Sequence, residues 1–109
     1  MDKYDVCVIG GGPSGFAAAM RCWDFGKRVC LIERDYLGGA GIFNGALSSK
    51  TLWELSRDYR RVMRRDRGYA VQGVSVDYAQ VCRSVDDAVR EKADQMERQL
   101  AALSERAVT

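Results

Sequence analysis

The stretch YDVCVIGGGPSGFAAAMRCWDFGKRVCLIE, residues 4–33, decides the fold of this 109-residue chain. Its first apolar run, residues 6–9, predicts a β-strand over about residues 4–9. The alanine-rich segment that follows predicts a helix over residues 13–25, which Gly26 ends because glycine tolerates a left-handed backbone. A second apolar run predicts a strand over residues 28–33. This order is that of a βαβ unit.

Three glycines at the turn between the first strand and the helix form a G-x-G-x-x-G motif: Gly10, Gly12 and Gly15. The first lets the chain turn sharply, the second lets the backbone approach a pyrophosphate, and the third lets the helix pack closely on the sheet. The amides at the helix start then face the phosphates. Glu33 closes the second strand, where a carboxylate can accept hydrogen bonds from a ribose. A dinucleotide site is therefore predicted, and a glycine-rich turn without a ligand is the alternative.

An acid at position 33 favours a ligand with a free 2′-hydroxyl, because a carboxylate would repel a 2′-phosphate. That fits FAD or NAD better than NADP, although Arg34 weakens the discrimination. Composition is that of a single small globular domain, with 47% apolar and 29% charged residues. No apolar run reaches the roughly 18 residues of a membrane span, and the chain starts without a signal-peptide pattern. A cytoplasmic location is expected.

The cysteines show no metal-binding spacing. None of the four belongs to a C-x-x-C, and the chain has no histidine, so neither a metal site nor a structural disulfide is expected. Cys7, Cys22 and Cys30 fall in the predicted strands and first helix, where they are expected to be small buried hydrophobic residues. Without histidine, any proton transfer must use a lysine, a tyrosine, a cofactor or another polypeptide.

The second half of the chain predicts two helices. Residues 35–44 predict a glycine-rich loop against the ligand, and a helix from about residue 46 fades into an arginine cluster and breaks at Gly68. That cluster, residues 57–67, holds six arginines against two aspartates. A solvated helix end is favoured over a nucleic-acid patch, because the aromatic residues here do not interleave with the arginines as a stacking platform would require. After a connector, residues 69–76, an Asp77–Gln80 capping pattern opens a long helix over residues 78–104.

The predicted sheet is incomplete. Two parallel strands cannot form an independent sheet, so the fold class is α/β, an N-terminal βαβ part of a Rossmann-type domain followed by two helices. The long last helix carries an apolar stripe over about eight turns. It could be a dimer face, but packing against a missing part of the same protein is the favoured interpretation. Residues 1–109 are thus expected to be part of a larger domain.

The chain resembles the pyridine nucleotide–disulfide oxidoreductase family, which includes dihydrolipoamide dehydrogenase. The segments YDVCVIGGGPSG and LIERDYLGGAGIFNGALSSKTL and the long helix carry the resemblance. It implies that Glu33 holds the adenosine ribose, and that Lys50, in a Ser-Lys pair, lies near the flavin N5. It further implies that the remaining cofactor-binding residues lie along the FAD phosphates: Gly10, Gly12, Pro13, Ser14, Gly15, Gly38 and Gly39.

The chain departs from the family at the redox pair. Gly41 and Ala46 occupy the two cysteine positions, and Ser48 replaces the usual proline. Neither Gly41 nor Ala46 can supply a thiolate, so disulfide reduction by the family's route is excluded. Mutational decay of a nonfunctional copy is the alternative explanation.

The expected function is the FAD-binding portion of a dihydrolipoamide dehydrogenase-like flavoprotein oxidoreductase. Its NAD(P)H-linked electrons would pass to a small-molecule, non-disulfide acceptor. NAD(H) or NADP(H) is expected only if the missing domain exists, and this chain alone is expected to be inactive. Expected partners are a second copy or the missing portion, with no nucleic acid and no metal. Two other hypotheses remain: a noncatalytic fragment or association module, and an NAD-binding Rossmann piece.

Overall fold

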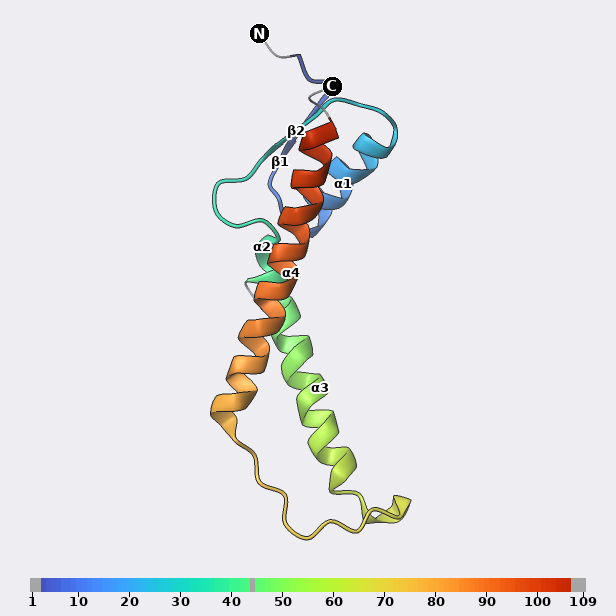
Figure 1. Ribbon diagram of the computed structural model, residues 1–109, viewed down its shortest axis with the longest axis vertical. Coiled ribbons are helices and arrows are strands. Elements are labelled where there is room, and N and C mark those ends of the chain that lie inside the picture. Colours follow the sequence, from blue (N-terminus) through green and yellow to red (C-terminus); the bar gives the residue numbers. More distant parts are fainter. Residues whose placement is uncertain (1–2, 44, 107–109) are drawn as a thin grey trace.

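A computed structural model of the chain describes residues 3–43 and 45–106 and shows a small α/β head on a long helical hairpin (Figure 1). The elements follow in the order β1 (Val6–Ile9), α1 (Pro13–Asp24), β2 (Val29–Ile32), α2 (Gly39–Ile42), α3 (Ala46–Val62), η1 (Arg65–Arg67) and α4 (Tyr78–Arg106). The molecule measures 67 × 25 × 21 Å, with a radius of gyration of 19.8 Å. A compact chain of this length would have a radius of gyration of about 13 Å, so the hairpin extends well away from the head.

The two strands pair in parallel, and α1 is the crossover between them. Val6 pairs with Val29 and Val8 with Leu31, and these four residues share one face of the sheet because side chains alternate along a strand. Helix α1 packs on that face. The predicted βαβ unit is confirmed, with strands one or two residues shorter at their ends than expected.

The opposite face of the sheet is uncovered by the described residues. It carries Cys7 and Ile9 of β1 with Cys30 and Ile32 of β2, and Ile9 is 85% exposed. The prediction of buried cysteines is wrong, since Cys7 is exposed while Cys22 and Cys30 are only half-buried. The apolar runs alone predicted that the cysteines would be buried. Burial of these side chains needs a layer packed on their face of the sheet, and among the described residues only the opposite face has such a layer.

Helix α2 lies in the segment that was predicted to be a loop. Its four residues are Gly-Ala-Gly-Ile, a composition with little helix propensity. Ile42 is only 4% exposed, so tertiary packing of this side chain accounts for the short helix. The sequence pattern missed it because a single turn is too short to show a helical period.

The hairpin packs well near the head and opens at its far end. Helices α3 and α4 lie side by side next to the head and separate toward the η1 turn (Figure 1). Val85 and Met96 of α4 are buried, whereas Tyr78, at the far end of the predicted apolar stripe, is 70% exposed. The Asp77 cap is confirmed, because Asp77 Oδ1 accepts a hydrogen bond from the Gln80 amide at 3.1 Å.

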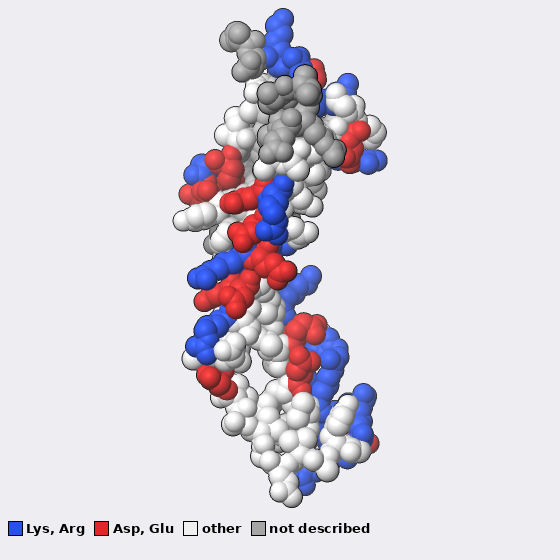
Figure 2. All heavy atoms as spheres, in the orientation of Figure 1, with Lys and Arg blue, Asp and Glu red and all other residues white. Residues whose placement is uncertain are grey.

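The arginine cluster lies on the far part of the hairpin and is solvated, as predicted. Helix α3 ends at Val62, before the expected break, and Gly68 follows η1 with a φ of 76°. Within the cluster Arg61 pairs with Asp58 at 3.3 Å and Arg64 pairs with Asp66. Figure 2 shows charges of both signs along the hairpin. None of the helices in the described part of the chain is long and apolar enough to cross a membrane.

Replacing Gly15 by alanine should destabilise the fold. A Cβ at Gly15 would lie 1.8 Å from the Gly10 carbonyl oxygen, a backbone atom that cannot rotate away. We expect Gly15→Ala to cost roughly 1–3 kcal/mol or more, as for overpacked cores. Urea unfolding, monitored by circular dichroism, measures this loss of stability. The matched control is Gly12→Ser, because a Cβ at Gly12 meets no atom within 4 Å. Equal urea midpoints for Gly15→Ala and the unmodified chain would contradict this packing.

Candidate nucleotide-binding site

Gly11 joins three segments of the chain at the carboxyl end of the sheet. Its amide donates a hydrogen bond to Glu33 Oε2 beyond β2, and its carbonyl oxygen accepts one from the Gly38 amide at 2.8 Å. Gly11 is buried, and a Cβ there would lie 2.8 Å from Leu37 Cδ1. The motif glycines, the acid and the second glycine pair therefore form one unit.

Glu33 is held by three backbone amides. Besides the Gly11 amide, those of Arg34 and Asp35 donate to Glu33 Oε1 at 2.8 and 3.0 Å. The hydrogen bond from Asp35 and then that from Gly11 lower the pKa of Glu33 below its ordinary value, so the side chain is a carboxylate at neutral pH. A carboxylate has about four acceptor positions, and these amides use three, which leaves one for a hydroxyl donor.

The start of α1 is free to receive an anion. Gly12 is the N-cap residue without a side-chain cap, and the first turn of α1 contains no acid. The first amides of a helix have no partner within the helix and carry the positive end of its dipole. Because a Cβ at Gly12 would meet open space, a ligand can approach the backbone there. The residues present fit a pyrophosphate.

The second glycine pair lies against the motif glycines. Gly38 and Gly39 have φ values of 104° and 45°, in the region that favours glycine. A Cβ at Gly38 would lie 2.4 Å from Ile42 Cδ1, while a Cβ at Gly39 would lie 3.4 Å from the Gly12 Cα. The structure thus brings together Gly12 and Gly39, two residues that sequence analysis assigned to one ligand.

An apolar pocket of about 260 Å³ adjoins this unit, between α1, α2 and α4. Phe16 and Met96 line it, and Lys92 of α4 is the one cation among the described residues that line it. Gly41 also lines the pocket, and a Cβ there would lie 2.3 Å from Pro13 Cγ. The Pro13 ring therefore occupies the space that a side chain at position 41 would need. The packing around Gly41 therefore leaves no room for the cysteine that the resemblance would place at this position.

Lys50 stands apart from this pocket. It lies about one turn into α3, its side chain is exposed, and it has no hydrogen-bond or ion-pair partner among the described residues. Lys92 was not predicted from the sequence; it lies one turn before Met96, at the border of the apolar stripe of α4. Gly11 was not predicted either, because the motif pattern leaves that position open. The run of three consecutive glycines, residues 10–12, is the feature of the sequence that could have indicated Gly11.

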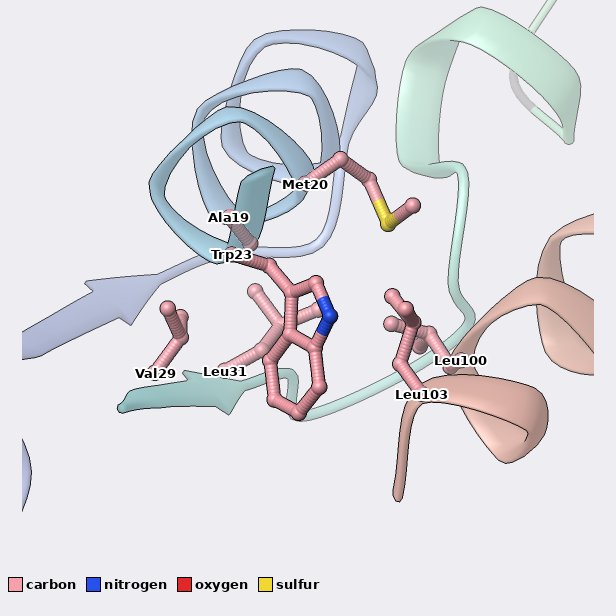
Figure 3. A pocket seen from close by; sticks show the side chains of 7 residues that line it. All are labelled: Ala19, Met20, Trp23, Val29, Leu31, Leu100 and Leu103. Atoms are coloured by element: carbon pink, nitrogen blue, oxygen red, sulfur yellow. The ribbon is translucent and has the colours of Figure 1, made fainter. Parts of the chain in front are cut away.

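A second pocket, of about 210 Å³, lies on the covered face of the sheet. In Figure 3, Trp23 of α1 lies between Leu31 of β2 and two leucines of α4, Leu100 and Leu103. None of the described residues that line this pocket has a titratable side chain. The pocket lies where Leu100 and Leu103 of α4 face α1 and β2, away from the glycine turns.

Comparison with known proteins assigns the family. The sequence model described as FAD-dependent oxidoreductase matches residues 5–105. The chain belongs to this family. It is similar to mitochondrial dihydrolipoyl dehydrogenase of Schizosaccharomyces pombe, with 42% identity over 91 residues that cover 81% of this chain and 18% of that protein. A dihydrolipoyl dehydrogenase of Bacillus subtilis is 34% identical over 80 residues, 72% of this chain and 17% of its own.

A solved structure shares the fold. The HOCl-induced flavoprotein disulfide reductase RclA from Escherichia coli, as a Cu(II) complex, matches with a TM-score of 0.72 and 24% identity. The match covers 94% of this chain and 20% of that one, so the chain spans about a fifth of the length of these relatives. The predicted resemblance to the pyridine nucleotide–disulfide oxidoreductases, the α/β class and the incomplete sheet are confirmed.

Replacing Glu33 by glutamine should remove part of the acid sensitivity of the fold. Because the pKa of Glu33 is lowered on folding, its stabilisation is complete above the ordinary pKa of 4.5 and is lost as the pH falls through the folded value. We expect Glu33→Gln to lower the urea midpoint at neutral pH. The difference between the urea midpoints measured at neutral and at acidic pH should therefore be smaller than in the unmodified chain. Glu54→Gln, at an exposed ion pair, is the control. An unchanged gap in Glu33→Gln would contradict the role of this carboxylate.

Proposed function

We propose that this chain is the FAD-binding portion of a dihydrolipoamide dehydrogenase-like flavoprotein oxidoreductase. The observation that carries the proposal is the single unit formed by the motif glycines, Glu33 and the second glycine pair, held through Gly11. Membership of the FAD-dependent oxidoreductases supports FAD over NAD as its ligand. The rest of the FAD-binding domain would lie outside residues 1–109.

The chain's own residues would bind and orient the cofactor. The backbone at Gly10, Gly12, Ser14 and Gly15, with Pro13 starting the helix, would hold the pyrophosphate through amides and the α1 dipole. The one remaining acceptor position of Glu33 would take a ribose hydroxyl. Gly38 and Gly39 would place backbone along the phosphates, which their position against the motif glycines supports. FAD would supply the hydride and electron chemistry when bound.

The electron acceptor is proposed to be a small molecule other than a disulfide. A disulfide route needs two thiols beside the flavin, and positions 41 and 46 provide none. The packing of Pro13 against Gly41 supports a site built without that thiol. Lys50 would stabilise negative charge on the reduced cofactor if the cofactor extends to α3. NAD(H) or NADP(H) would serve as electron donor through the missing domain.

Replacing Gly12 by serine should block FAD binding without harming the fold. The φ and ψ of Gly12, −68° and −176°, suit an N-cap, and serine is a preferred N-cap residue whose hydroxyl would accept from the first amides of α1. The hydroxyl would fill the space and use the amides that the pyrophosphate needs. We expect unchanged or higher stability and loss of FAD binding, measured by quenching of flavin fluorescence on titration.

Ala18→Ser, on the exposed side of α1, is the matched control and should bind FAD like the unmodified chain. If the unmodified chain fails to bind FAD, or if Gly12→Ser binds it equally well, the proposed site is wrong.

A second candidate function, a module that folds or acts only by association, is favoured by the exposed apolar surface. Ile9, Phe25, Trp53 and Tyr78 are each more than half exposed, and only four apolar residues among those described form the buried core. We expect this chain to sediment as a dimer or larger species. A monomer that unfolds cooperatively would contradict the association module and leave the FAD proposal standing.

A further inference from the structure

Two aromatic side chains meet beside the second glycine pair. The ring centroids of Tyr36 and Phe43 lie 5.0 Å apart, and the planes of the rings are tilted by 36°. Tyr36 is in the loop between β2 and α2, which extends to one side of the sheet (Figure 1), and Phe43 directly follows α2. Aromatic rings attract each other at centroid distances of about 4.5–7 Å when they are not stacked face to face. This contact therefore joins the two ends of the segment 36–43.

The backbones of the same two residues bond to Gly39. The Gly39 amide donates to the Tyr36 carbonyl oxygen at 3.2 Å, and the Phe43 amide donates to the Gly39 carbonyl oxygen at 2.9 Å. The first bond closes a four-residue turn, 36–39. Its third residue, Gly38, has a φ of 104° and a ψ of −23°, as a type II turn requires at that position. Gly39 is thus bonded on both sides by the residues whose rings are in contact.

The composition of the segment 36–43 makes an ordered conformation costly. Three of its eight residues are glycines, and glycine loses more conformational freedom on folding than any other residue. Burial of Ile42 and the hydrogen bond from the Gly38 amide to Gly11 hold the middle of the segment. The aromatic pair holds its ends. Because both rings belong to this segment, their contact does not depend on which residues cover the sheet.

We propose that Tyr36 and Phe43 form a positioning pair, which holds the second glycine pair in the backbone geometry that receives the FAD phosphates. The pair rests on the proposed function, in which Gly38 and Gly39 place backbone along those phosphates. The two residues act through Gly39, because both of their backbones bond to it. A ligand that meets an ordered backbone loses less free energy to ordering it, so the pair raises affinity by preorganisation.

Replacing either ring by alanine should weaken FAD binding. The contribution of an aromatic pair corresponds to a factor of about 2 to 10 in an equilibrium constant. Tyr36→Ala and Phe43→Ala should each lower FAD affinity by about that factor, measured by quenching of flavin fluorescence. Hydrogen exchange at the Gly39 amide should accelerate by a similar factor. The Gly10 amide, bonded to Ile32 at the end of the sheet, should exchange as before, whereas a general loss of stability would accelerate both amides.

Three further variants separate the ring contact from other effects. Tyr36→Phe keeps the ring and should match the unmodified chain in affinity and in exchange. Tyr69→Ala removes another exposed tyrosine, in the connector before α4, and is the matched control. The double variant Tyr36→Ala/Phe43→Ala should bind FAD no more weakly than the weaker single variant, because one contact can be removed only once.

Unchanged exchange at the Gly39 amide in Tyr36→Ala would overturn the positioning pair. Effects of the two alanine replacements that add in the double variant would also overturn it, as would a lower affinity in Tyr36→Phe, which would assign the effect to the hydroxyl group. An unmodified chain that binds no FAD would contradict the proposed function and the ligand role of the pair. Exchange at Gly39 would then still decide whether the rings hold the glycine turn.

Discussion

Two hydrogen bonds on the backbone of Gly11 hold the site in one geometry. One connects the glycine turn after β1 to Glu33 after β2, and the other connects it to Gly38 before α2. Both lie at the carboxyl ends of the strands, where ligands bind in open α/β folds. The ends of two strands and the starts of α1 and α2 thereby meet at one place in the structure.

Much of this arrangement could be predicted from the sequence. The glycine spacing, the two apolar runs and the acid at position 33 predicted the βαβ unit, because each reports a local requirement of backbone or charge. The capping pattern at Asp77 predicted the start of α4 for the same reason. The missed features depend on contacts between distant segments. Helix α2 exists because Ile42 is buried, and the exposure of Cys7 depends on which face of the sheet α1 covers.

The head and the hairpin differ in how well they are packed. In the head, the sheet is covered on one face. In the hairpin, α3 and α4 lie side by side next to the head and separate toward the far end (Figure 1). A small buried core and a large exposed apolar surface fit a chain that spans about a fifth of its relatives. The packing of Pro13 on Gly41 does not depend on residues outside the described part of the chain. It removes the room for a thiol beside the proposed site.

Hydrogen exchange at the Gly11 and Gly38 amides tests the central claim most directly. If Gly11 joins the three segments, both amides exchange slowly and at similar rates, far more slowly than the amide of Gly73 in the exposed connector. Glu33→Gln should accelerate exchange at both, because loosening the carboxylate frees the glycine turn. A Gly38 amide that exchanges as fast as that of Gly73, or that is unaffected by Glu33→Gln, would contradict the account.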